Sequence, residues 1–158
     1  MAVIFESIAS TLLTIHLILA ITLVVSLIAS YYFVVFQVKK DASKFKTFRL
    51  ASLIGMLLYF STWFLGIAIY PVFKVNVMVV DFDVSLPILA GLFEIKEHIG
   101  GIAVVPAIAV ILLHVFFDLS DRENQPKFKL ALQLQTFVTF ATLFKMIMGF
   151  VFVAVHSI

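Results

Sequence analysis

The sequence predicts an all-α integral membrane protein: an antiparallel bundle of four transmembrane helices with both termini on the outer side. Of its 158 residues, 63% are hydrophobic and only 13% are charged, whereas a soluble domain is roughly half apolar and a quarter charged. Four apolar stretches each exceed the ~20 residues that a helix needs to cross a bilayer. We expect a single domain, residues 1–158, with spans at about residues 4–36, 49–70, 87–117 and 130–155.

Length and proline set the limits of these spans. The first span, 4–36, is longer than a bilayer requires, so we expect it to tilt or protrude. The second stops at Pro71, because proline disrupts the hydrogen bonding of a continuing helix. The third begins at Pro87, which suits the first turn of a helix. Pro106, close after Gly100–Gly101, predicts a kink inside the third span.

Basic residues predict how the bundle lies in the membrane. Of the 11 lysines and arginines, eight lie in or beside two loops, 37–48 and 118–129: Lys39, Lys40, Lys44, Lys46, Arg49, Arg122, Lys127 and Lys129. The positive-inside rule therefore places both loops in the cytoplasm and the connector 72–86 outside. That connector alternates valine with polar residues, which is typical of a short hairpin or of an extended cap on the membrane surface.

Ionisable side chains inside the spans are the main functional signal, because a charge in hydrocarbon is costly and commonly marks a working site. They are His16, Glu94, Lys96, Glu97, His98 and Lys145. At ~1.5 Å of rise per residue, His16, His98 and Lys145 are expected at similar depth in the outer half, close to Trp63. Glu94 and His98 share a helical face with Gly101, where a neighbouring helix or planar ligand could approach, while Lys96 points elsewhere.

One chemistry that suits this set is a b-type haem. Its iron takes two neutral imidazoles from different helices at equal depth, which predicts His16 and His98 as axial ligands. Trp63 would lie beside the ring, and Glu94, Glu97 or Lys145 would orient an imidazole or bind a propionate. His114, near the cytoplasmic end, is a less favoured ligand for a second haem. The protein would then be a small cytochrome or haem-bearing subunit that transfers electrons, with a quinone or redox protein at its outer face.

Two other hypotheses stay open. In the first, the chain is a cofactor-free accessory subunit of a larger complex or a homo-oligomer, and Lys145 pairs with Glu94 or Glu97 inside the membrane. In the second, the same acids form a non-haem metal site or a membrane-embedded oxidoreductase with His16 and His98. Whether the protein is an enzyme is left open. The absence of cysteine excludes disulfides and thiolate metal sites, and no surface for nucleic acid is evident, so the lipid bilayer is the expected partner.

The run from Trp63 to Tyr70, Trp-Phe-Leu-Gly-Ile-Ala-Ile-Tyr, is followed closely by Lys74. It resembles a Trp-x-x-Gly helix end found in copper-resistance membrane proteins and in bacterial haem-associated protoporphyrinogen oxidases. Ile95–Lys96 and Leu113–His114 are similar to the lysine and histidine helix of the second family. The resemblance implies a membrane protein that binds haem or a metal.

Overall fold

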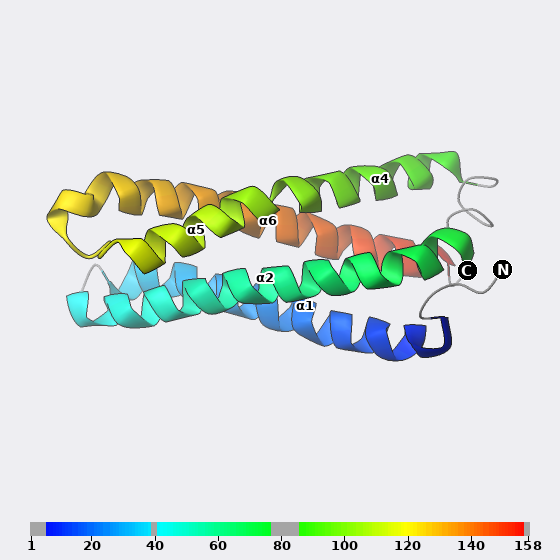
Figure 1. The fold of residues 1–158 in the computed structure, drawn as a ribbon, viewed down its shortest axis with the longest axis horizontal. Coiled ribbons are helices and arrows are strands. Elements are labelled where there is room, and N and C mark those ends of the chain that lie inside the picture. The colour runs from blue at the N-terminus through cyan, green and yellow to red at the C-terminus, as the bar shows by residue number, and fades with distance from the viewer. Residues whose placement is uncertain (1–5, 39–40, 77–85, 157–158) are drawn as a thin grey trace.

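The computed structural model describes residues 6–38, 41–76 and 86–156. These residues are helical and include no strand (Figure 1). The helices are α1 (Ala9–Tyr32), α2 (Phe45–Phe73), α4 (Pro87–Ile102), α5 (Val104–Phe116) and α6 (Gln125–His156). Shorter helical turns cover Glu6–Ile8, Phe33–Gln37, Ala42–Lys44 and Arg122–Asn124. The part of the connector at 77–85, predicted as a hairpin or cap, lies outside the described residues.

Four rods lie side by side, because α4 and α5 follow one another as a single rod (Figure 1). The starts of α1 and α4 and the ends of α2 and α6 lie at one end of the bundle, here called the Pro87 end. The start of α2, the end of α5 and the start of α6 lie at the opposite end, here called the Phe45 end. Residues that are far apart in the sequence therefore lie at the same height along the bundle axis.

All four rods are long and apolar enough to span a membrane: Ala9–Gln37, Phe45–Asn76, Pro87–Phe116 and Arg122–Ala154. Their outward faces carry large apolar side chains, among them Phe64, 62% exposed, Phe140, 65% exposed, and Val105, 70% exposed. A surface of this kind is unusual in a soluble monomer and suits contact with lipid tails.

Two prolines act differently from each other. The second span does not stop at Pro71: α2 runs from Phe45 through this residue to Phe73. Proline is tolerated in membrane helices when neighbouring groups satisfy the freed backbone. In the third rod, the helix breaks at Ala103, just before Pro106. Pro106 has no N–H for the carbonyl of Ile102 and crowds it sterically, so the predicted kink appears as the junction of α4 and α5.

The core fills the centre and the Phe45 end of the bundle. Side chains from all the rods pack at the centre: Leu23, Leu27, Met56, Tyr59, Ala103, Ala107, Val110, Val138 and Ala141. A second cluster at the Phe45 end contains Val34, Phe45, Phe48, Leu119 and Ala131. At the Pro87 end, the smaller cluster of Ala90, Phe93 and Phe152 joins α4 to α6. Among the described residues, the packing between the rods is therefore sparser at the Pro87 end.

The two connections at the Phe45 end use the same local hydrogen bonding. Asp41 accepts bonds from the backbone N–H and the hydroxyl of Ser43 at 2.9 and 2.8 Å. Asp118 accepts the equivalent bonds from Ser120 at 3.1 and 2.6 Å. In each pair, the serine hydroxyl is the main reason that the pKa of the carboxyl lies below its usual value, and the serine N–H is the second reason. Both carboxylates favour a tight turn between consecutive rods.

Candidate functional site

A cavity of about 460 Å³ lies between α1, α2, α4 and α6 in the Pro87 half of the bundle. Its volume falls within the ~300–1,000 Å³ that is typical of small-molecule sites. The floor borders the central core and is formed by Leu23, Tyr59, Thr142 and Lys145. Lining residues that are also exposed at the bundle surface include Leu17 on α1 and Phe150 on α6. The cavity therefore opens sideways between these two helices, toward the lipid.

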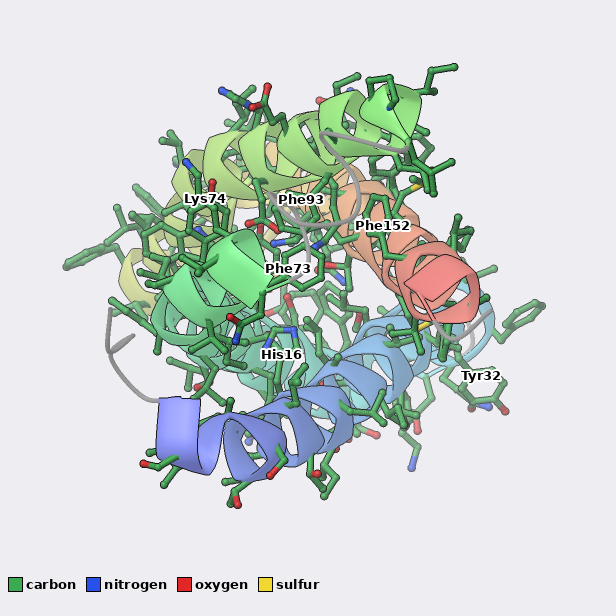
Figure 2. The ribbon with its side chains drawn as sticks, turned by 90° about the vertical axis from the view of Figure 1, so that its right-hand side faces the viewer. His16, Tyr32, Phe73, Lys74, Phe93 and Phe152 are labelled. Atoms are coloured by element: carbon green, nitrogen blue, oxygen red, sulfur yellow. The ribbon has the colours of Figure 1, made fainter. Side chains whose placement is uncertain are left out.

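His16 extends from α1 into this cavity and points to the middle of the bundle (Figure 2). Gly66 of α2 leaves room for the ring, since a Cβ at this position would lie 3.7 Å from His16 Cε1. The imidazole lies near the backbone of Thr62 on α2. Its Nδ1 is buried and has no hydrogen-bond partner among the described residues. An unpartnered buried ring nitrogen is uncommon and is suited to a ligand.

Three charged side chains line the same cavity. Lys96 and Glu97 project from α4 and form an ion pair with a distance of 2.9 Å between Lys96 Nζ and Glu97 Oε1. Lys96 Nζ also lies 4.3 Å from the centre of the Phe93 ring, a favourable cation–π arrangement. Lys145 projects from α6. Two lysines against one glutamate leave one excess positive charge, so the cavity favours an anionic group.

Aromatic rings form the wall near the Pro87 end. Phe93 stacks on Phe73 at 4.6 Å between ring centres, with 17° between the planes, and on Tyr70 at 5.9 Å. Phe152 meets Phe93 at 5.5 Å. Seen along the bundle, these phenylalanines lie over its middle (Figure 2), and they line the cavity together with His16. Trp63 lines the cavity as well, so a flat apolar ligand would find aromatic surface on several sides.

The structure unites four of the predicted site residues and separates two. His16, Trp63, Glu97 and Lys145 line the cavity. Glu94 and His98 are exposed on the other face of α4, where His98 Nδ1 lies 2.7 Å from the backbone oxygen of Glu94. The expected meeting of His98 with His16 is therefore absent from this arrangement.

The prediction that Lys96 points away from the site also differs from the structure, because Lys96 lines the cavity. The close helix approach occurs at Gly100, which packs against Lys145, whereas a Cβ at Gly101 would meet nothing within 4 Å. These differences have one cause: α4 presents the face of Phe93, Glu97 and Gly100 to the bundle. The predicted face, of Glu94, His98 and Gly101, is the exposed one.

His114 lies apart from the cavity, in the Phe45 half. Its side chain is fully buried and its ring meets Phe48 edge-on at 5.6 Å. Neither ring nitrogen has a hydrogen-bond partner among the described residues. Across the described ranges, no three histidine, aspartate or glutamate side chains gather closely enough to hold a metal ion.

Two contributors to the cavity floor were not among the predicted site residues. The hydroxyl of Tyr59 donates to the backbone oxygen of Gly100 at 2.5 Å, and Thr142 also belongs to the lining. Their signal was present in the sequence, since both are polar residues within apolar spans. A scan against protein-family models finds no match for this chain, and searches of curated proteins and of solved structures find none either.

Proposed function

We propose that this chain is a membrane protein that binds a b-type haem in its cavity, with His16 as an axial ligand. The observation that carries this proposal is the unpartnered, buried Nδ1 of His16 in a cavity of ligand size. Haem would supply reversible one-electron chemistry. The protein would serve electron transfer, with a quinone or redox protein as the partner.

The residues of the cavity fit such a group. A histidine ligand commonly has its second ring nitrogen bonded to the protein, which fixes the ring orientation, and the backbone of Thr62 is available for that role. Aromatic side chains offer flat apolar surface, and Lys96 and Lys145 provide cations for the propionates. Glu97 would hold Lys96 in place through their ion pair.

The orientation of the bundle is part of the proposal. The rods run antiparallel, the basic loops 37–48 and 118–129 face the cytoplasm, and both termini face outward. The Pro87 end is then the outer end, and the cavity occupies the outer half of the membrane. A redox partner outside the cell membrane would approach the aromatic wall.

Two single variants test the ligand assignment. His16→Ala should remove the visible haem spectrum from protein purified in mild detergent, because no other described residue of the cavity lining carries an imidazole. His98→Ala is the matched control and should keep the spectrum, since His98 lies on the exposed face of α4. Loss of haem from both variants would instead favour axial ligation by the pair His16 and His98, and haem retained by His16→Ala would refute the assignment.

A second candidate function is supported by the ion pair itself. Glu97 and Lys96 neutralise each other at 2.9 Å, which suits a cofactor-free accessory subunit of a membrane complex. In this candidate the cation of the ion pair is Lys96, whereas the sequence analysis predicted Lys145 in that role. It predicts a featureless visible spectrum together with co-purification of a partner subunit that Glu97→Gln weakens.

A further inference from the structure

Gly100 lies at the floor of the cavity and organises two side chains there. Its backbone oxygen accepts the hydroxyl of Tyr59 at 2.5 Å. The side chain of Lys145 passes over its Cα, so that a Cβ at position 100 would lie 2.9 Å from both Cδ and Cε of Lys145, and closer still to Nζ. Because real Cβ contacts are not so short, the missing side chain of Gly100 leaves a notch for Lys145, and any larger residue there would require this flexible side chain to move.

Hydroxyl donors at the floor are already in use. Tyr59 donates to Gly100, Thr62 donates to the backbone oxygen of Leu58, and Thr142 donates to that of Val138 at 2.8 Å. Among the described residues, Lys145 Nζ has neither a hydrogen bond nor an ion pair within bonding distance. It is therefore the donor that remains for a ligand at this depth.

The charges point the same way. Glu97 attracts Lys145 electrostatically, but its carboxylate forms an ion pair with Lys96. A lysine far from water is costly unless an anion neutralises it. The sideways opening between α1 and α6 gives a route for an amphipathic anion from the lipid phase.

We propose that Lys145, held in the notch at Gly100, binds a carboxylate of the ligand at the floor of the cavity. This inference rests on the proposed function where the carboxylate is a haem propionate. A membrane fatty acid offers the same chemistry. The shared recognition element is the anionic carboxylate, and the assays below separate the two sources.

The first assay compares haemin with its dimethyl ester, which lacks the carboxylate charge, on purified full-length protein in neutral detergent. Wild type should bind haemin about ten- to hundredfold more tightly than the ester, the range expected for one hydrogen bond to a charged group. Lys145→Met keeps much of the side-chain volume without the charge, and should lose most of this preference, keeping only the part that Lys96 contributes. Equal binding of haemin and ester by the wild type, or a preference for haemin in Lys145→Met as large as in the wild type, would overturn the proposal.

Gly100→Ala and Gly101→Ala form a matched pair, since both replace a glycine in α4 with the better helix former. Gly100→Ala should displace Lys145 and reduce the preference for haemin to that of Lys145→Met, whereas Gly101→Ala should behave as wild type because its Cβ meets nothing within 4 Å. A monodisperse elution profile and an unchanged helical circular dichroism spectrum show that each variant is folded. If Gly100→Ala prefers haemin over the ester as strongly as the wild type does, the proposed role of Gly100 in placing Lys145 is wrong.

A fluorescent fatty acid, cis-parinaric acid, separates failure of this inference from failure of the haem proposal. If wild type binds neither haemin nor its ester but does bind the fatty acid, and Lys145→Met and Gly100→Ala lose that binding, the carboxylate site stands with a lipid as its source. If the wild type binds haemin and its ester equally, the haem proposal stands and the carboxylate site is rejected. If the wild type binds none of the three probes, both the haem proposal and the carboxylate site are rejected.

Discussion

Gln135 shows what a single polar residue does inside this bundle. It is fully buried, its amide nitrogen donates to the Ser30 hydroxyl, and its amide oxygen accepts the hydroxyl of Ser52 at 2.8 Å. Ser30 in turn donates to the backbone oxygen of Leu27 at 2.7 Å. One side chain of α6 therefore joins α1 and α2, in a setting where lipid offers no competing partner.

Replacing this amide should weaken the bundle. We expect Gln135→Leu to lower the free energy of unfolding by about 1 kcal/mol, because hydrogen bonds between membrane helices contribute about that much. Gln133→Leu, at an exposed position two residues earlier, should leave the stability unchanged or raise it. Unfolding by sodium dodecyl sulfate in mixed micelles measures both, and equal losses from the two variants would argue against the network.

Four of the residues that line the cavity were predictable from the sequence, but the rotation of α4 about its own axis was not. The sequence identified His16, Trp63, Glu97 and Lys145, all of which line the cavity. It assigned the site face of α4 to Glu94, His98 and Gly101 because lipid-facing and core-facing positions of a membrane helix are both apolar. The usual contrast between a polar and an apolar face is therefore missing, and only contacts with other helices fix the rotation.

At the scale of elements, the junction of α4 and α5 is the feature with most influence on the cavity. Hydrogen bonds continue on both sides of it, from Ala103 N–H to the Ile99 oxygen and from Ala107 N–H to the Ala103 oxygen, each at 3.1 Å. Between these two hydrogen bonds, Pro106 has no N–H to donate to the carbonyl of Ile102. The break sets the direction of α4, which carries Lys96, Glu97 and Gly100.

Pro106→Ala should therefore straighten this rod, because alanine restores a donor for the Ile102 carbonyl. The chain has no cysteine, so spin labels at Gly91→Cys on α4 and Ile21→Cys on α1 report the change cleanly. We expect their electron–electron distance distribution to shift. Pro126→Ala, in the first turn of α6 where proline is well accommodated, is the control. An unshifted distribution for Pro106→Ala would assign the break to another cause.

The number and order of the spanning elements were predictable from apolar length alone, and their ends less so. The second rod begins at Phe45 and continues past Pro71 to Asn76, against a predicted 49–70. Lys46 and Arg49 made its start look like part of a loop, yet long basic side chains can extend along a helix toward the membrane surface. A single proline near the end of a membrane helix likewise did not end it.

At the scale of the whole molecule, orientation in the membrane rests on the charge of two loops. A membrane-impermeant maleimide should label Asn76→Cys in intact cells, because the Pro87 end faces outward in our proposal. Glu123→Cys, between α5 and α6, should react only after the cells are permeabilised. The opposite pattern would invert the bundle and place the cavity in the inner half of the membrane.

The central claim concerns the occupant of the cavity, and a visible spectrum tests it most directly. The wild-type protein, purified in mild detergent from haem-replete cells, would be recorded as isolated and after reduction with dithionite. Our account predicts a Soret band that shifts on reduction and that is missing from the His16→Ala protein. A featureless spectrum from folded wild-type protein would contradict the haem proposal and favour the accessory subunit.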